Sequence, residues 1–230
     1  MGRREAGSLP QRLIILGPPG AGKGTQAKKL TEVLDVPHIA SGDLFRHHRS
    51  KGTPLGIKAS EYMNNGLLVP DEITTAMVLE RIQPPLDMQG YLLDGFPRNM
   101  FQAQALDDMA ARGRPVDYVI LISVPDDELV ARLSGRHICG ACQASYHIKT
   151  APPSTPGRCD RCGGDLLQRE DDRPEAVRVR IRVYNEETHP MLDHYARSGK
   201  LVEVDGLGRI DEVAERLLKA MHLGPSVGGP

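Results

Sequence analysis

A glycine-rich segment near the N-terminus constrains the fold of this chain more than any other feature. The segment GPPGAGKGT at residues 17–25 follows an apolar run at 13–16 and precedes a stretch with helical character at 23–34. Glycines let backbone N–H groups converge on phosphate oxygens, and the N-terminus of the following helix adds partial positive charge there. Lys23 adds a full charge. A plain glycine-rich turn is the alternative, but the spacing, the lysine, the threonine and the strand–helix context together favour a phosphate-binding loop.

The loop departs from the general phosphate-loop pattern at one position. In that pattern a Ser or Thr hydroxyl that binds Mg²⁺ directly follows the lysine. Here Gly24 stands between Lys23 and Thr25. Direct metal ligation by Thr25 is therefore left open by the sequence.

The rest of the chain alternates between strand-like and helical segments. Strands are predicted at 13–16, 37–40, 91–93, 118–124 and 201–204, and helices at 23–34, 71–81, 99–112, 126–133, 174–197 and 210–221. This alternation predicts a parallel sheet covered by helices on both faces, a doubly wound α/β fold. The length of 230 residues suits one such domain with smaller inserts.

Residues 137–168 interrupt the alternation. They contain all four cysteines together with Pro152, Pro153 and Pro156. This composition predicts a small irregular or antiparallel insert. Residues 1–12 and 223–230, at the two ends of the chain, are predicted to be disordered tails.

The cysteines form two C-x-x-C pairs, Cys139/Cys142 and Cys159/Cys162, separated by sixteen residues. Four thiolates can close a tetrahedral shell, so we predict a structural zinc site without catalytic function. Iron or cobalt could occupy the same ligands. Two disulfides are disfavoured in a reducing compartment, and free thiols would not explain the paired spacing. His147 lies nearby but is not needed as a ligand.

Charge and hydropathy exclude several locations and partners. The N-terminal segment lacks the apolar run of a secretory signal, and the chain contains no uncharged apolar run as long as a membrane span. The net charge of −1 gives no bulk attraction to nucleic acid or anionic membrane. We therefore expect a cytoplasmic protein with no membrane or nucleic-acid partner.

Four stretches resemble, in order, the motifs of the adenylate kinase family. They are GPPGAGKGTQ at 17–26, SGDLFR at 41–46, LLDGFPR at 92–98, and the segment 169–180 with Asp171 and Asp172. The resemblance runs from residue 13 to residue 218, and the cysteine pairs are similar to those of the bacterial long-lid form with zinc in its lid. It implies a P-loop core of residues 13–39, 70–134 and 173–222. It also implies a helical AMP-binding insert at 40–69 and a lid at 135–172, with Asp171 and Asp172 at the lid hinge.

The resemblance implies reversible Mg²⁺-dependent phosphoryl transfer, ATP + AMP = 2 ADP, by a monomer. An AMP phosphate oxygen would attack the γ-phosphorus of ATP directly, so that catalysis consists of alignment and charge neutralisation. The implied catalytic residues are Lys23, Arg98, Arg136, Arg169 and Arg180. A single arginine among these would be read as a surface charge, but they match the family as a set.

The resemblance also assigns the nucleotide sites. The ATP-binding residues would be Gly20, Ala21, Gly22, Lys23, Gly24, Thr25, Arg132, Arg136, Ser145, Tyr146 and Gly208. The AMP-binding residues would be Ser41, Arg46, Leu67, Leu68, Val69, Gly95, Phe96, Pro97, Arg98, Gln102, Arg169 and Arg180. Arg132 would stack on the ATP base, and Gln102 would read the AMP base, although from the sequence alone Gln102 is better explained as an exposed helix residue. Asp94, with Thr25, would orient Mg²⁺ through bound waters.

Two other functions compete with this prediction. A GTP:AMP phosphotransferase would share nearly every motif, because the choice of donor base depends on lid details. A zinc-ribbon module that binds nucleic acid would account for the cysteines. The near-neutral net charge and the complete phosphate-binding set argue against the second.

Overall fold

The computed structural model describes residues 11–82, 90–110 and 115–222. Its central sheet has five parallel strands in the order β2-β3-β1-β4-β8. These strands are β1 (Arg12–Leu16), β2 (His38–Ala40), β3 (Tyr91–Asp94), β4 (Tyr118–Ser123) and β8 (Leu201–Asp205). The predicted doubly wound α/β fold is confirmed, with each strand within one residue of its predicted bounds.

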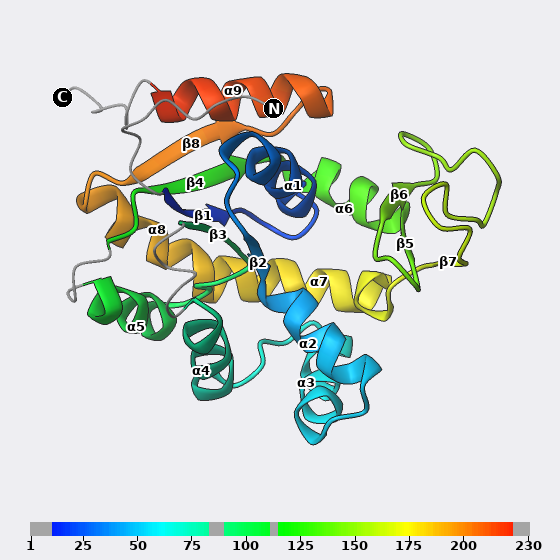
Figure 1. Ribbon diagram of the computed structural model, residues 1–230, viewed down its shortest axis with the longest axis horizontal. Coiled ribbons are helices and arrows are strands. Elements are labelled where there is room, and N and C mark those ends of the chain that lie inside the picture. The colour runs from blue at the N-terminus through cyan, green and yellow to red at the C-terminus, as the bar shows by residue number, and fades with distance from the viewer. Residues whose placement is uncertain (1–10, 83–89, 111–114, 223–230) are drawn as a thin grey trace.

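Helices cover both faces of this sheet (Figure 1). They are α1 (Lys23–Leu34), α4 (Asp71–Arg81), α5 (Met100–Ala110), α6 (Asp126–Ser134), α7 (Pro174–Val183), α8 (His189–Arg197) and α9 (Ile210–His222). Strand side chains alternate between faces. Leu13 and Ile15 therefore pack with α1 and α9, whereas Ile14 and Leu16 pack with α4, α5 and α8.

The predicted tails fall almost wholly outside the described residues. Residues 1–10 and 223–230 are not described, whereas Arg12, which we placed in the first tail, opens β1 and pairs with Tyr91. The hydropathy pattern missed Arg12 because strand pairing uses the backbone and tolerates a polar side chain at a strand end.

The stretch 174–197, predicted as one helix, is divided by a π-helical turn. The turn η3 (Tyr184–Thr188) joins α7 to α8. Pro190 follows it, in the first turn of α8. Proline has no N–H to donate to the preceding turn, so a regular α-helical hydrogen-bond ladder cannot continue through it.

Two short helices, α2 (Ser41–Ser50) and α3 (Pro54–Asn64), follow β2 and form a helical hairpin below the sheet in Figure 1. Thr53 caps α3 by accepting a hydrogen bond from the Gly56 N–H at 3.1 Å. A Cβ at Gly56 would lie 2.2 Å from the backbone of α2, so glycine permits the close crossing of the two helices. Phe45, Ala59 and Val69 form a separate small core here.

The cysteine-rich insert is a three-stranded antiparallel sheet at one end of the domain, one of the two forms that its composition predicted (Figure 1). Its strands are β5 (Arg136–Cys139), β6 (Ser145–His147) and β7 (Leu166–Leu167), in the order β6-β5-β7, and the 3₁₀ turn η2 (Glu170–Asp172) leads back to α7. Its buried core consists of Cys139, Ala144 and Cys159. This core is small for an independently stable unit.

Candidate active site

The phosphate loop joins β1 to α1 and adopts a conformation that its glycines permit. Gly17, Gly20 and Gly22 have φ values of +145°, +89° and +91°. A Cβ at Gly20 would also lie 2.9 Å from the Leu129 carbonyl oxygen of α6. Residues with side chains rarely adopt such backbone conformations. The glycines thus allow the loop to turn tightly into the N-terminus of α1, where free N–H groups and the helix dipole attract anions.

Lys23 lies in the first turn of α1 and turns back over the loop. Its Nζ donates hydrogen bonds to the carbonyl oxygens of Gly17 at 2.7 Å and Pro18 at 2.9 Å. Burial, opposed by the charge of Asp94 and reinforced by Arg98, lowers the pKa of Lys23 to about 7. A phosphate group beside Nζ would supply a nearby negative charge, which favours the protonated form of the amine.

Asp94, at the end of β3, lies close to the loop. A Cβ at Gly24 would lie 3.4 Å from its Oδ2, and the same oxygen lies 3.3 Å from the Nε2 of His38 on β2. Burial alone would raise the pKa of Asp94, but the His38 hydrogen bond and the charge of Lys23 outweigh burial and lower it. The carboxylate is thus held ionised, the form that binds Mg²⁺ directly or through water.

Five arginines form a cluster whose charges act on one another, and three of them also act on Lys23. They are Arg46, Arg98, Arg136, Arg169 and Arg180. Burial, together with the neighbouring arginine charges, lowers the pKa of Arg98 to about 10 and that of Arg169 to about 9. The buried Nε atoms of Arg46 and Arg169 have no hydrogen-bond partner among the described residues. Crowded cations with unused donors form a site for a polyanion.

Asp172 ties the two ends of the lid together. The residue is 1% exposed. Its carboxylate accepts two hydrogen bonds from Arg136, at 2.7 Å from Nε and 2.5 Å from Nη2. It also accepts one from Arg180 of α7 at 2.9 Å. Asp171 lies 3.0 Å from Arg180. The start of β5 and the last turn of α7 are therefore joined through one buried carboxylate.

A pocket between β3, the α2–α3 hairpin and α5 contains most of the predicted AMP-binding residues. Its lining includes Ser41, Leu67, Leu68, Val69, Gly95, Arg98 and Gln102. The Gly95 carbonyl accepts hydrogen bonds from Ser41 Oγ at 2.7 Å and Arg98 Nε at 2.8 Å. Pro97 lines the adjoining pocket over the phosphate loop, together with Lys23 and Arg180, whereas Phe96 is fully buried in the core and lines neither pocket.

Gln102 is 1% exposed, so it is not an ordinary exposed helix residue. Its Oε1 accepts from the Arg98 N–H at 2.8 Å, and its Nε2 donates to Asp71 at 2.7 Å. Asn99 also donates to Asp71, at 2.9 Å. These contacts fix the amide at the edge of the pocket.

The residues predicted to hold the donor base lie on two elements. Arg132, on α6, donates to Glu128 at 2.8 Å and to the Gly206 carbonyl at 3.1 Å, which places it beside the loop that contains Gly208. Ser145 and Tyr146 lie on β6 of the lid. The Tyr146 hydroxyl accepts from the Asp160 N–H at 2.8 Å and lies 3.4 Å from Cys159 Sγ, so this side chain packs against the cysteine cluster.

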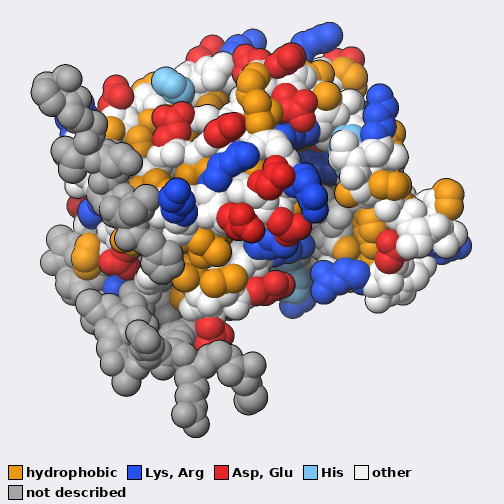
Figure 2. All heavy atoms as spheres, turned by 90° about the horizontal axis from the view of Figure 1, so that it is seen from above, with side chains coloured by type: hydrophobic (Ala, Val, Ile, Leu, Met, Phe, Trp, Pro, Cys, Tyr) orange, Lys and Arg blue, Asp and Glu red, His pale blue; other side chains and the backbone are white. Residues whose placement is uncertain are grey.

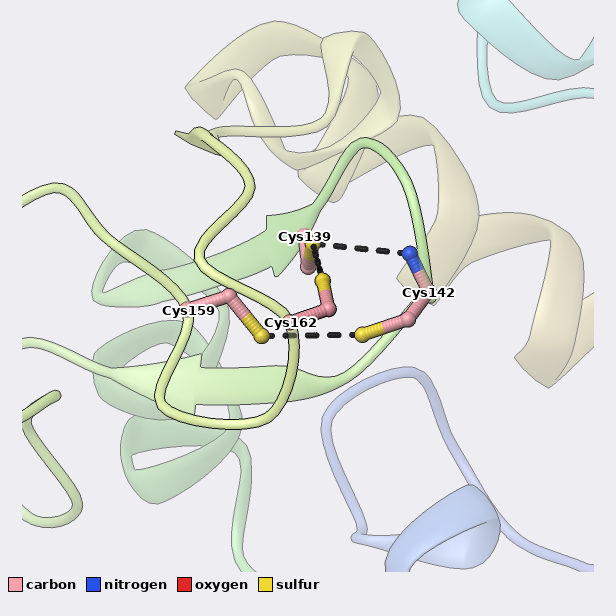
Figure 3. Close-up of side chains that lie close together, drawn as sticks. All are labelled: Cys139, Cys142, Cys159 and Cys162. Carbon is pink, nitrogen blue, oxygen red and sulfur yellow. Dashed lines mark hydrogen bonds between the residues drawn. The ribbon is translucent and has the colours of Figure 1, made fainter.

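The four cysteine sulfurs converge, as Figure 3 shows, and all lie within 4.8 Å of one another. Cys139 and Cys162 approach to 3.4 Å, and Cys142 and Cys159 to 3.5 Å. Tetrahedral zinc with Zn–S distances of about 2.3 Å places its sulfurs about 3.8 Å apart. The Cys142 N–H lies 3.5 Å from Cys139 Sγ and lowers the pKa of that thiol. The donor set and its spacing fit a four-thiolate metal site.

Sequence reasoning missed three residues that support the site: His38 against Asp94, Asp71 against Gln102, and Thr188 against Arg98. All three lie outside the four motifs that carry the family resemblance. Their side chains contact the site residues only in the folded chain, and no local spacing signals such contacts.

The helices of the described residues are all too short or too polar to cross a membrane.

Comparison with known proteins identifies the family of this chain. The family model described as adenylate kinase matches residues 15–200. The chain is 48% identical to an adenylate kinase of Clostridium perfringens (strain 13 / Type A), over 93% of this chain and 98% of that protein. It is 51% identical to one of Carboxydothermus hydrogenoformans, over 92% and 99% of the two chains, and 49% identical to one of Moorella thermoacetica, over 91% and 97%. With the phosphate loop, the arginine cluster and the four-cysteine lid in place, the chain belongs to the adenylate kinase family.

Proposed function

We propose that this chain catalyses reversible transfer of a phosphoryl group between ATP and AMP to give two ADP, and so balances the adenine nucleotides of the cell. Members of its family are nucleoside monophosphate kinases. The observation that carries the proposal is that Lys23, Arg98 and Arg180 line one pocket over the phosphate loop. Arg98 also lines the neighbouring pocket beside α2 and α5, called the AMP-side pocket below.

The chemistry requires no nucleophile from the protein. The bond between the γ-phosphorus of ATP and its bridging oxygen breaks while a phosphate oxygen of AMP forms a new bond to that phosphorus. Negative charge shifts onto the transferring group and the ADP leaving group. Lys23, Arg98, Arg136, Arg169 and Arg180 would neutralise that charge and hold the two nucleotides in line.

The ATP phosphates would lie in the loop, against the N–H groups of residues 20–25 and the start of α1. Arg132, Ser145, Tyr146 and Gly208 would contact its base. AMP would occupy the pocket beside α2 and α5, with its phosphate on Arg46, Arg98, Arg169 and Arg180 and its base against residues 67–69 and Gln102.

Mg²⁺ would arrive with the nucleotide and neutralise phosphate charge when bound. The ionised Asp94 would orient its water ligands, and the half-buried Thr25 would lie near it. The closeness of Gly24 to Asp94 supports this placement.

The four thiolates would hold a zinc ion with a purely structural role. A closed four-sulfur shell has no open position for water or phosphate. The metal would replace the hydrophobic core that the three-stranded lid lacks.

A monomer in the cytoplasm, without a nucleic-acid or membrane partner, is the setting that we propose. The net charge of −1 supports the lack of a nucleic-acid partner. Figure 2 shows acidic and basic side chains interspersed on the face that contains α9, without a continuous basic stripe.

A coupled assay that crosses ATP and GTP with AMP, CMP and UMP tests the proposed function. We expect ATP with AMP to give the highest kcat/KM. A preference for GTP would indicate a GTP:AMP phosphotransferase instead. Equal use of the three acceptors would show that the AMP-side pocket does not read the base.

A further inference from the structure

The π-turn η3 between α7 and α8 adjoins the active site. The His189 N–H donates to the Tyr184 carbonyl, five residues earlier, which defines the wider turn. A π-turn inserts one residue into a helix and rotates the following side chains by about 100°. Tyr184 and Thr188 from this turn line the same pocket as Lys23, Arg98 and Arg180. Such turns occur frequently at functional sites.

Thr188 makes a direct contact with the arginine that faces both nucleotide pockets. Its side chain is buried, at 5% exposure, and its hydroxyl donates a hydrogen bond to the backbone carbonyl of Arg98 at 2.7 Å. The two residues are ninety positions apart in the chain. The bond therefore joins the α7–α8 helix to the loop between β3 and α5.

Two further hydrogen bonds fix Arg98. Its backbone N–H donates to Gln102, and its Nε donates to the Gly95 carbonyl, each at 2.8 Å. Thus the N–H, the carbonyl and Nε of this residue are all held. Among the residues that the structure describes, its terminal Nη atoms have no hydrogen-bond partner, so they remain available for phosphate.

We propose that Thr188 is a positioning residue for AMP binding and phosphoryl transfer, acting through the backbone of Arg98. This inference rests on the proposed role of Arg98 in binding the AMP phosphate. Bidentate binding of phosphate by a guanidinium depends on orientation, and small misplacements of such a group reduce its effect substantially. Because α7 also carries Arg180, the turn keeps the two arginines in a fixed relation.

The alternative is that Thr188 only satisfies a half-buried carbonyl and stabilises the fold. Measurements of stability and of substrate binding distinguish this structural role from the proposed positioning role. Thr188→Val keeps the shape of the side chain and removes the donor, whereas Thr188→Ser keeps the donor. Thr31→Val is a matched control, since the Thr31 hydroxyl also donates to a backbone carbonyl, that of Ala27 at 2.9 Å, on α1.

The test measures AMP and ATP dissociation constants by calorimetry, steady-state kcat and KM, and the melting temperature of each variant. In Thr188→Val we expect AMP to bind about threefold to tenfold more weakly, the range for loss of one hydrogen bond. We expect KM for AMP to rise with it and kcat to fall. ATP binding should stay within about twofold of wild type, and Thr188→Ser and Thr31→Val should bind AMP as the wild type does.

Wild-type AMP binding and turnover in a folded Thr188→Val variant would overturn the inference. So would equal losses for ATP and AMP, or failure of Thr188→Ser to restore AMP binding. If Thr188→Val does not fold, Thr188→Ala gives the same comparison with a smaller side chain. A wild-type chain that does not bind AMP would overturn the proposed function as well, so the two failures are distinguishable.

Discussion

Lys23 is the one cation that the phosphate loop itself contributes. In the proposed mechanism its amine lies beside the transferring phosphoryl group, so its loss should remove stabilisation of the transition state. We expect Lys23→Met to lower kcat at least about 100-fold, as removal of such a donor does in other enzymes. Steady-state kinetics on the folded variant give the measurement.

Lys29 offers a matched control on the same helix. Its amine pairs with Asp211 at 2.6 Å on the surface, away from the loop. Lys29→Met should leave kcat within about twofold of wild type, because exposed ion pairs contribute little. Equal effects of the two substitutions would argue against the role of Lys23.

The lowered pKa of Lys23 predicts a coupling between ATP binding and protons. Free Lys23, with a pKa of about 7, is largely neutral at pH 8, whereas bound phosphates favour the charged amine. The complex then binds more protons than the free protein, so ATP affinity falls as pH rises above about 7. Calorimetry with MgATP at pH 8, in two buffers of different ionisation enthalpy, should detect proton uptake. The Lys23→Met variant should lack most of this uptake, and its persistence there would assign the proton to another group.

At the scale of residues, the sequence predicts those members of the site that belong to motifs and misses their supports. Lys23, Arg98 and the cysteines stand in recognisable patterns. Thr188 and His38 do not, because a hydroxyl or imidazole acquires its role only when a distant strand or helix brings it to Arg98 or Asp94. The burial of Gln102 was likewise not visible in the sequence.

At the scale of elements, Asp172 joins the two ends of the cysteine-rich insert. This carboxylate bridges Arg136 and Arg180 while buried, so its neutralisation leaves Arg136 without its acidic partner and Arg180 with Asp171 alone. We expect Asp172→Asn to lower the free energy of unfolding by about 3 kcal/mol. Urea denaturation followed by circular dichroism gives the measurement.

Asp165→Asn is the control for that variant. Asp165 pairs with Arg158 at 2.8 Å, but both side chains are more than half exposed. Exposed pairs contribute at most about 1 kcal/mol, so this variant should unfold nearly as the wild type does. Similar losses in the two variants would show that the Asp172 bridge has no special role in stability.

If the four cysteines hold zinc as proposed, loss of the metal should lower the stability of the lid and leave the phosphoryl-transfer step largely unchanged. Elemental analysis should find about one zinc per chain, the number that one tetrahedral site accepts. Cys142→Ser should lower zinc content and melting temperature. At temperatures where the lid stays folded, kcat should remain within about tenfold of wild type, or about 1.4 kcal/mol in barrier.

Mg²⁺ must be restored in excess after any chelator treatment, since the reaction also needs that ion. A zinc-free variant that keeps its melting temperature but loses all turnover would make the metal catalytic.

The clustering of the four cysteines could be predicted because C-x-x-C spacing is a local pattern. The π-turn at Tyr184–Thr188 could not, since one inserted residue leaves the helical hydropathy pattern almost unchanged.

At the scale of the whole molecule, the parallel sheet could be predicted because its strands are buried on both faces and read as apolar runs. The strand order could not, since β1 lies between β3 and β4 and that pairing is non-local. This order places the phosphate loop, which follows β1, beside Asp94 at the end of the neighbouring strand β3. The sheet thus brings together the two parts of the site that the nucleotide phosphates and Mg²⁺ would share.

The stoichiometry of the reaction, followed by ³¹P NMR with purified protein, MgATP and AMP, tests the central claim most directly. We expect one ATP and one AMP to disappear for every two ADP formed, and the same final mixture to be reached from MgADP alone. Loss of ATP with release of inorganic phosphate and no loss of AMP would show hydrolysis in place of transfer and would contradict the account.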